Sequence, residues 1–407
     1  MKTITLIYFN AGGGHRAAAT ALATVIGQQQ RPWRVHCINL VDMLDPLGRF
    51  RQVTGRAPED LYNLRLARGW TLGLAQELKL LQGLIHLGHA TLVRRLQPHW
   101  LRTRPDLVVS LVPNFNRALC SSLAQALPGV PFVTVLTDLA DHPPHFWIEP
   151  GQHQHLVCGT AKAVAQARAA GYGDAQVHRS SGMVIRPDFY DAPATEPGLD
   201  RRQQQARLGL DPDRPTGVVM FGGVGSMAML GIARQLADVQ LVLMCGHHAR
   251  LARELQKLRP TAPHAVVGFT PDVQRHLMLG DFFIGKPGPG SLSEAVQQGL
   301  PVITFRNAWT LPQERYNTDW VQEHSLGLVG SSLRQVRPLV TELLGRLDEF
   351  KAHVRRVDNR AVFEVPAILA AILDGAALAP RRWPLAKLAE PVDGPVLEPI
   401  AELAVAG

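Results

Sequence analysis

The sequence predicts an α/β protein built from two doubly wound domains, and three observations carry this prediction. Apolar runs of strand length alternate with helical patterns in both halves of the chain, as in parallel sheets covered by helices. A glycine-rich turn directly follows such a run in each half, at 11–14 and at 285–290. The length of 407 residues also exceeds what one ordinary core accommodates.

The apolar runs give the expected strands and the domain boundaries. In the first half they occupy 3–9, 33–40, 106–111, 131–136, 155–158 and 176–179. In the second half they occupy 217–222, 239–244, 265–268, 281–284 and 301–305. We therefore expect an N-terminal domain at 1–182 with a helical insert at about 43–100, a C-terminal domain at 183–375, and a poorly ordered tail at 376–407.

Composition indicates a globular protein of a reducing compartment. Hydrophobic residues make up 46% of the chain, yet no stretch approaches the eighteen consecutive apolar residues of a membrane-spanning helix. The apolar run before Asn10 is too short for a signal peptide. The four cysteines are far apart and form no paired motif. We expect a cytoplasmic protein whose cysteines are reduced core thiols.

The predicted insert carries most of the positive charge. The chain has a formal net charge of +8, and the segment 43–105 holds ten basic and four acidic residues, an excess of six positive charges. Leucines alternate with these cations in a helical pattern, which favours docking on an anionic membrane surface. Two alternatives remain, a helix packed into its own domain with a solvated basic face, and a nucleic-acid-binding face.

The stretch 282–296 combines a buried strand, a Gly/Pro turn and the start of a helix. Ser291 is expected to cap that helix, with Glu294 three residues later completing a capping box. Bare backbone N–H groups at a helix N-terminus suit a diphosphate. The alternative interpretation is a well-capped turn between strand and helix without a ligand.

Two further stretches lie where parallel strands end, the position that faces the ligand crevice in open α/β sheets. The turn at 12–17 also fits the pattern G-x-G-x-x-A, with Asp42 after the second strand, so a nicotinamide dinucleotide is an alternative ligand. The strand at 131–136 leads into a loop with Asp and His residues at 138–145. A metal site is disfavoured there, because the prolines make the loop irregular.

An ordered set of motifs resembles the monogalactosyldiacylglycerol synthases, a superfamily that includes the GlcNAc transferase of lipid II synthesis. The motifs run from about residue 6 to residue 330. They are Gly12-Gly13-Gly14-His15-Arg16, Thr137-Asp138-Leu139 with His142-Pro143, Met183-Val184-Ile185-Arg186-Pro187, Phe221-Gly222-Gly223, Cys245-Gly246, Val267-Gly268-Phe269-Thr270, Lys286-Pro287-Gly288-Pro289-Gly290-Ser291, Glu294-Ala295, Gly299-Leu300-Pro301 and Pro312-Gln313-Glu314.

This resemblance implies a GT-B fold, with two Rossmann-like domains facing each other across a cleft. It also implies a glycolipid-synthesising enzyme that transfers a hexose from a UDP-sugar to a diacylglycerol-like lipid with inversion, without a metal or other cofactor. Its expected partners are the UDP-sugar, the lipid and the anionic inner face of the cell membrane, where it binds peripherally, and no nucleic acid. Galactose, glucose and GlcNAc all remain open as the sugar. The alternatives are an epimerase of the same fold and, less favoured, a nicotinamide-dependent oxidoreductase.

The resemblance also assigns site residues. Donor contacts are expected at Arg186, Gly222, Gly223, Ser226, Phe269, Thr270, Gly288, Pro289, Gly290, Ser291, Glu294, Gln313 and Glu314. Acceptor contacts are expected at Gly13, Gly14, His142 and Trp147. We expect His15 to act as the general base because imidazole titrates near neutral pH, with Asp138 as its support or replacement. The alternative for His15 is a local backbone cap.

Overall fold

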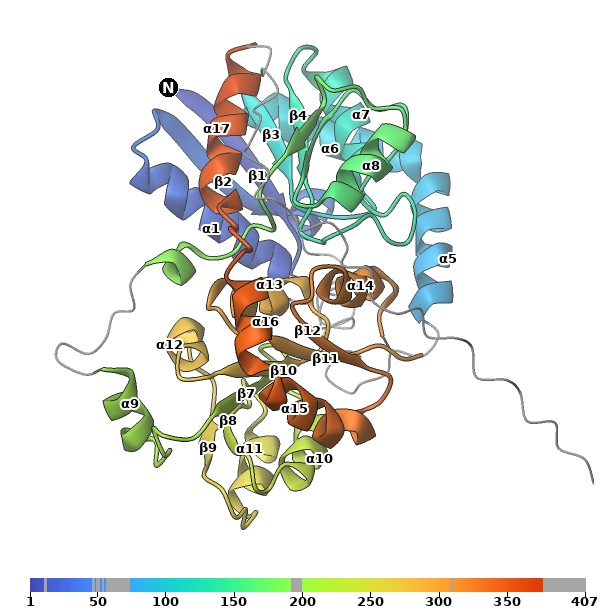
Figure 1. The fold of residues 1–407 in the computed structure, drawn as a ribbon. Helices are drawn as coiled ribbons and strands as arrows, with labels where there is room; N and C mark the ends of the chain where they lie inside the picture. Colours follow the sequence, from blue (N-terminus) through green and yellow to red (C-terminus); the bar gives the residue numbers. More distant parts are fainter. Residues whose placement is uncertain are drawn as a thin grey trace, which may run out of the picture.

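The protein has two α/β domains, which stand one above the other in Figure 1. A computed structural model describes residues 1–10, 13–45, 48, 52, 55, 74–191, 200–308 and 310–375. The predicted tail at 376–407 and most of the predicted insert between 46 and 73 lie outside these residues. The prediction of two doubly wound domains is confirmed by two six-stranded sheets in which every neighbouring pair of strands is parallel.

The N-terminal sheet has the strand order β2-β1-β3-β4-β5-β6. Its strands are β1 (Lys2–Tyr8), β2 (Trp33–Asn39), β3 (Leu107–Ser110), β4 (Phe132–Val135), β5 (His155–Cys158) and β6 (Val177–Arg179). All six were predicted from apolar runs. The two central strands, β3 and β4, are buried along their whole length, as expected for strands covered by helices on both faces.

The C-terminal sheet has the order β12-β11-β10-β7-β8-β9. Its strands are β7 (Thr216–Met220), β8 (Gln240–Met244), β9 (His264–Val267), β10 (Phe282–Gly285), β11 (Val302–Phe305) and β12 (Gly327–Gly330). Strand β12 was not predicted. Its four residues place only Leu328 and Val329 between two glycines, which is too short an apolar run to recognise.

Helices cover both faces of each sheet. In the first domain these are α1 (Gly14–Gln28), α2 (Leu40–Leu44), α5 (Leu74–Leu87), α6 (His89–Thr103), α7 (Asn116–Ala126) and α8 (Ala161–Ala169). The second domain contributes α9 (Arg201–Arg207), α10 (Ala228–Gln235), α11 (Ala249–Gln256), α12 (Val273–Leu277), α13 (Pro289–Gln297), α14 (Arg315–Glu323), α15 (Val336–Gly345) and α16 (Leu347–Val354), and α17 (Ala361–Leu373) ends the described chain. Within the described ranges, no helix combines the length and apolar character needed to span a bilayer.

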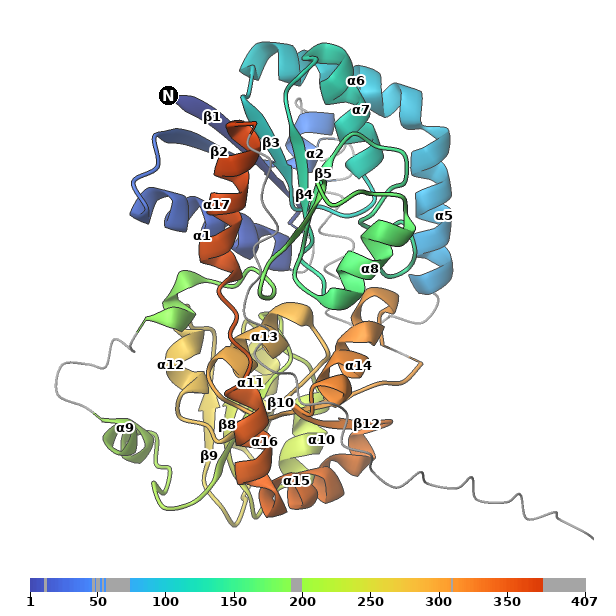
Figure 2. The ribbon, with the colours of Figure 1, turned by 45° about the horizontal axis from the view of Figure 1, so that its top comes forward.

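Helix α17 belongs to the N-terminal core, which corrects the expected boundary of the C-terminal domain at 375. Figures 1 and 2 both show α17 crossing back to lie beside α1. Val362, Val365 and Leu369 of α17 are fully buried in the same cluster as β1 and α1. Burial of this apolar face against the N-terminal core stabilises the return of the chain to the first domain.

Hydrogen bonds tie the two interdomain crossings to each other. Glu364 Oε2 accepts from the backbone N–H and the hydroxyl of Ser181, at 2.7 and 3.0 Å. Asn359 Nδ2 donates to the carbonyl oxygen of Met183 at 2.9 Å. Gly182 permits this approach, since a Cβ atom there would stand 2.6 Å from Asn359 Cγ. Each crossing therefore supports the other where the chain passes between domains.

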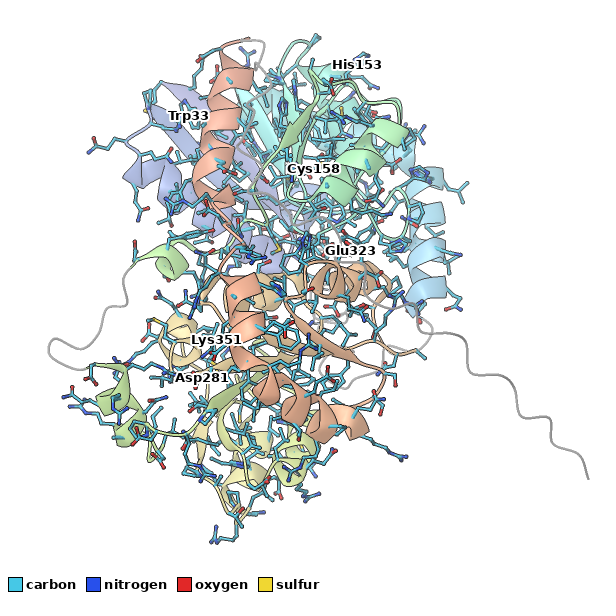
Figure 3. The ribbon with its side chains drawn as sticks, viewed as in Figure 1. Trp33, His153, Cys158, Asp281, Glu323 and Lys351 are labelled. Atoms are coloured by element: carbon cyan, nitrogen blue, oxygen red, sulfur yellow. The ribbon has the colours of Figure 1, made fainter. Side chains whose placement is uncertain are left out.

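The cysteines are free, as predicted, although not all of them are core thiols. Cys120, Cys158 and Cys245 are buried, whereas Cys37 is exposed. Figure 3 shows Cys158 inside the first domain, and Asp281 beside Lys351 inside the second.

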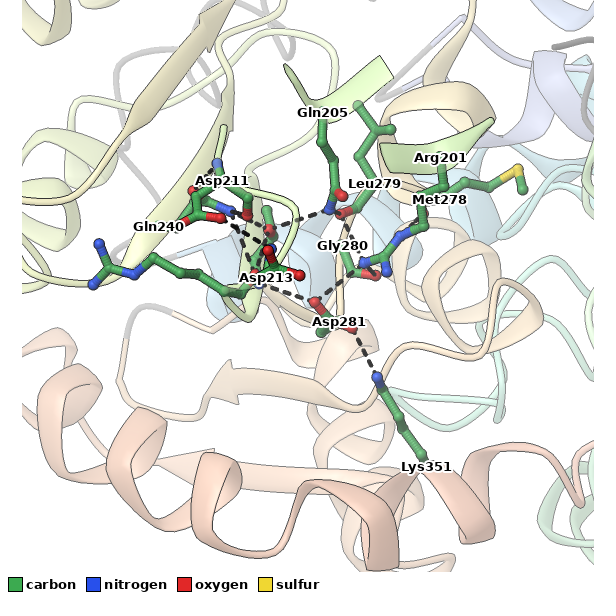
Figure 4. A network of polar contacts seen from close by, with 12 residues as sticks. Arg201, Gln205, Asp211, Asp213, Gln240, Met278, Leu279, Gly280, Asp281 and Lys351 are labelled. Carbon is green, nitrogen blue, oxygen red and sulfur yellow. Dashed lines mark hydrogen bonds and ion pairs between the residues drawn. The ribbon is translucent and has the colours of Figure 1, made fainter. Parts of the chain in front are cut away.

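Asp281 joins three elements of the C-terminal domain (Figure 4). Its Oδ2 accepts from the backbone N–H of Thr216 at 3.0 Å and from Arg201 at 3.1 Å, and its Oδ1 accepts from Lys351 at 2.8 Å. Burial opposes ionisation, but these donors outweigh it and lower the pKa of Asp281 below the ordinary value of 3.8. The carboxylate thus connects β7, α9 and α16 at the start of β10.

We predict that Asp281→Asn lowers the free energy of unfolding by ~1.5–3 kcal/mol at neutral pH, the range for hydrogen bonds to a charged group. Because the folded pKa is depressed, this contribution is complete above the unfolded value and disappears as the pH falls below about 4. Urea titrations at pH 7 and pH 3 measure it. The control is Asp238→Asn, which breaks a solvent-exposed pair with Arg337 and should leave the free energy of unfolding almost unchanged. Equal losses in both variants would contradict the assigned role.

Candidate active site

A large cavity of about 1400 Å³ lies between the two domains and is lined by most of the predicted site residues. His15, Asp138, Gly13 and Gly14 line it from the N-terminal domain. The predicted donor residues that line it from the other side are Arg186, Gly222, Gly223, Phe269, Thr270, Gly288, Pro289, Gly290, Ser291, Glu294, Gln313 and Glu314. Ser226, His142 and Trp147 are not among its lining residues.

The N-terminus of α13 opens into this cleft, with a cap that differs from the prediction. The helix begins at Pro289 with Gly288 as its N-cap, and no side chain caps it, so the expected capping box of Ser291 and Glu294 is wrong. With proline at the first helical position, the helix starts three residues earlier than it would with Ser291 as its cap. The first N–H groups therefore face the cleft without a side-chain partner, as an anion site requires.

Glu294 lies in the second turn of α13, half-buried and lining the cleft. Burial raises the pKa of its carboxyl group to about 7, although the nearby Arg186 partly opposes the shift. Arg186 in turn donates to the carbonyl oxygen of Pro271 at 3.0 Å and lies over the ring of Phe189. Since Glu294 does not cap the helix, its position is available for a ligand contact.

Lys286 and Glu314 form an ion pair across the loops that follow β10 and β11. Lys286 Nζ lies 2.9 Å from Glu314 Oε1, and the Glu314 side chain is buried. Asn317 donates to the carbonyl oxygen of Pro287 at 2.7 Å and so holds the Gly/Pro turn in place. The sequence named Lys286 only as part of a motif. Its pairing with Glu314 could be seen only in the folded structure, because 28 residues separate the two in the sequence.

Phe269 exposes an aromatic ring at the cleft. The side chain is 59% exposed and stacks on His247, with ring centroids 3.8 Å apart and planes 17° apart. An exposed ring of this kind provides a stacking surface for a planar base. Ser226 instead accepts from the backbone N–H of Ala228 at 3.3 Å, where it stabilises the start of α10.

On the opposite wall, His15 is the second residue of α1 and pairs with Thr137. His15 Nδ1 lies 2.9 Å from Thr137 Oγ1, so Thr137, rather than the expected Asp138, is the side-chain partner of this nitrogen. Burial lowers the pKa of the imidazole to about 4, and a hydrogen bond with the backbone of Leu111 only partly opposes the shift. The ring is therefore neutral at pH 7 and a weak base.

Asp138 follows β4 and is held by an indole. Trp147 Nε1 donates to Asp138 Oδ2 at 2.8 Å. Burial raises the pKa of Asp138 to about 7; the indole hydrogen bond opposes this shift, while Glu314 and Asp141 add to it. Trp147 is fully buried, which corrects its expected role as an acceptor contact. It supports the cleft wall from behind.

The rest of the loop after β4 also differs from the expected acceptor site. His142 is exposed outside the cleft lining. Asp141 accepts from the backbone N–H groups of Trp147 at 2.6 Å and His145 at 3.0 Å, so its carboxylate organises the loop. In the described part of the chain no three His, Cys, Asp or Glu side chains are grouped so as to hold a metal ion.

An apolar wall that the sequence did not indicate continues the cleft outward from His15. Its side chains are Phe9, Leu40, Val41, Leu44, Leu78, Leu81, Val112, Phe115 and Phe146. Helix α5, which supplies Leu78 and Leu81, stands at the outer edge of the N-terminal domain in Figures 1 and 2. Leu80, Leu84 and Leu87 of the same helix are 65%, 56% and 86% exposed. The apolar surface therefore extends from the cleft to the outside of the molecule.

Comparison with known sequences confirms the resemblance. No family model matches the chain. It is 26% identical to monogalactosyldiacylglycerol synthase 1, chloroplastic, of Arabidopsis thaliana, over 84% of this chain and 65% of that protein. It is 32% identical to a probable monogalactosyldiacylglycerol synthase 2, chloroplastic, of Oryza sativa subsp. japonica, over 65% of this chain and 58% of that protein. The chain thus spans less than two thirds of the length of these curated relatives.

Comparison with solved structures supports the predicted fold. MurG of Acinetobacter baumannii superimposes with a TM-score of 0.56 at 11% identity, covering 91% of this chain and 99% of MurG. The UDP-GlcNAc 2-epimerase of Neisseria meningitidis, solved with UDP-GlcNAc bound, superimposes with a TM-score of 0.57 at 15% identity, covering 92% of this chain and all of the epimerase. At these identities the likeness concerns the fold. The chain has a GT-B fold, and its curated homologues are the monogalactosyldiacylglycerol synthases.

Proposed function

We propose that the protein is an inverting glycosyltransferase that moves a hexose from a UDP-sugar to the hydroxyl group of a diacylglycerol-like membrane lipid. The observation that carries the proposal is the position of the uncapped α13 N-terminus, which lines the same cleft as His15 and Asp138 of the other domain. The curated relatives are named as monogalactosyldiacylglycerol synthases, which supports the same reaction class.

The C-terminal wall fits a nucleoside diphosphate. Three chemical features occur together there: bare N–H groups at Gly290 and Ser291 for phosphates, the carboxyl group of Glu294 for ribose hydroxyls, and the exposed ring of Phe269 for the base. The helix dipole favours the negative charge of the departing UDP. We propose that this electrostatic stabilisation replaces a metal ion.

The reaction is a single displacement. The acceptor oxygen forms a bond to the anomeric carbon, while the bond between that carbon and the β-phosphate oxygen breaks and its electron pair leaves with UDP. The hydroxyl proton passes to a base on the N-terminal wall, where His15 and Asp138 lie. Attack from the face opposite UDP inverts the anomeric configuration.

The apolar wall fits the acyl chains of the acceptor, and the exposed face of α5 fits the membrane that supplies it. Lys79, Arg94, Arg95, Arg102 and Arg104 on or just beyond α5 and α6 are exposed and positively charged. The other five cations of the predicted basic segment lie outside the described residues. Leucines inserted among headgroups with cations around them are typical of peripheral membrane binding.

UDP is predicted to stabilise the protein, which tests the donor class. A ligand at 100 times its Kd adds about 2.7 kcal/mol to the free energy of unfolding, so the melting temperature should rise by several degrees. NAD and oligonucleotides should leave it unchanged. Mass spectrometry with UDP-galactose, UDP-glucose, UDP-GlcNAc and diacylglycerol then identifies the product. Stabilisation by NAD alone would refute the proposal, and an epimerised sugar nucleotide without glycolipid would favour the epimerase.

Affinity for a UDP-hexose is predicted to fall as the pH drops from 8 to 6. The carboxyl pKa of Glu294 is about 7, and only its ionised form accepts both ribose hydroxyls. Binding therefore strengthens above pH 7 and weakens below it. Glu294→Gln should lower affinity about tenfold at pH 8 and flatten this pH dependence. Because Glu294 does not cap the helix, the Glu294→Gln variant should keep the melting temperature of the wild type. A lower melting temperature with unchanged affinity would contradict the role of Glu294 in ligand binding.

Vesicle binding is predicted to require both anionic lipid and the leucines of α5. The double variant Leu80→Ser/Leu84→Ser should reduce sedimentation with phosphatidylglycerol vesicles by tenfold or more, since each buried leucine contributes ~1.5–3 kcal/mol. Leu208→Ser, at an exposed leucine of the other domain, is the matched control. Binding should also weaken at high salt. Equal binding of the double variant, or equal binding to neutral vesicles at high salt, would argue against this surface.

A further inference from the structure

The fully buried indole of Trp147 lies beneath the two candidate bases. Its N–H group donates to Asp138 Oδ2 at 2.8 Å, and its ring lies 5.8 Å from the His15 ring at an angle of 51°. Trp147 has no exposed surface, so its side chain acts on the cleft only through these neighbours. Buried indole N–H groups ordinarily have a hydrogen-bond partner, and here that partner is a carboxylate that lines the cleft.

The backbone around Trp147 is fixed from two directions. Asp141 accepts from its N–H group at 2.6 Å, and Asn116 donates to its carbonyl oxygen at 3.0 Å. Asn116 is in turn bonded to Ser110 at the end of β3, at 2.6 Å. Through these bonds β3 and the loop after β4 set the indole at one place and one angle.

We propose that Trp147 is a positioning residue that holds the Asp138 carboxylate as the proton acceptor of the transfer reaction. The inference rests on the proposed function. The indole occupies Oδ2, which leaves Oδ1 as the oxygen of this group available to the acceptor hydroxyl. Because the donated hydrogen bond favours the ionised form, it also keeps the carboxylate ionised near neutral pH, and so able to accept a proton.

This assignment exchanges the roles expected for His15 and Asp138. The pKa of His15 is about 4 and that of Asp138 about 7, so Asp138 is the stronger base by about a thousandfold. Besides His15, which lies against the Trp147 ring, three ionisable groups act on the pKa of Asp138: Asp141 on its own loop, and Lys286 with Glu314 from the other domain. The last two oppose each other in charge. His15 remains neutral and suited to orient the acceptor hydroxyl.

The test begins with Trp147→Phe, which keeps an aromatic ring and removes the N–H donor. We expect the acid limb of the kcat–pH profile to move up by about one unit or more, because a lost hydrogen bond to a charged group raises the pKa of Asp138. Turnover at pH 7 should fall about tenfold and recover at pH 9, with KM for the UDP-sugar unchanged. Asp138→Asn should lower kcat by ~10²–10⁴ at every pH, because it removes the base. His15→Gln should leave the acid limb of the kcat–pH profile in place.

Trp100→Phe is the matched control. Trp100 is also fully buried and donates its indole N–H to Ser122 Oγ at 2.8 Å, but it lies outside the cleft lining. The Trp100→Phe variant should be less stable than the wild type, but the acid limb of its kcat–pH profile should not shift. If the limb stays in place in Trp147→Phe, whatever its rate or stability, the positioning role is wrong. A limb that disappears in His15→Gln would return the base to His15.

A second measurement does not depend on turnover and separates this inference from the proposed function. Tryptophan emission of the wild type should change with pH through about 7, because ionisation of Asp138 alters the field at the Trp147 indole. The step should vanish in Asp138→Asn and in Trp147→Phe and persist in Trp100→Phe. Absence of the step in the wild type would overturn the inference even if sugar transfer is found. Its presence without any transfer activity would retain the Trp147–Asp138 coupling and reject the proposed reaction.

Discussion

The common direction of the strands is the constraint on which the rest of the structure depends. Each sheet is parallel throughout, so all its strands end at one edge, and loops far apart in the sequence meet there. Both domains turn this edge to the cleft. His15 after β1 and Asp138 after β4 therefore face Lys286 after β10, although more than 140 residues separate the last two.

Burial in the cleft then divides the ionisable groups into two classes. Removal from water disfavours the charged form of any side chain, so it lowers the pKa of an imidazole and raises that of a carboxyl group. The pKa of His15 falls to about 4, while the pKa values of Asp138 and Glu294 rise to about 7. The same physical effect means that the two carboxyl groups titrate near neutral pH and that the histidine does not. For this reason the proposed proton transfer is assigned to a carboxyl group and not to the histidine.

Sequence patterns predicted what depends on local periodicity and failed where tertiary packing decided. Eleven of the twelve strands followed from apolar runs, and the glycine turns located both walls of the cleft. The cap of α13 was misplaced because Pro289 starts the helix before Ser291. The pairing of His15 with Thr137 and the burial of Trp147 depend on how distant loops pack. No spacing in the chain encodes either contact.

The division of the site between two domains gives the crossings a role in its geometry. The α13 N-terminus and Asp138 belong to different domains, so their separation is set where the chain passes between domains, at 181–183 and 359–364. Glu364 and Asn359 join these two crossings by hydrogen bonds to Ser181 and Met183. Because α17 is anchored in the N-terminal core, the second crossing cannot shift without disturbing that core. The alignment of carboxylate and helix terminus across the cleft is therefore controlled by contacts that touch neither of them.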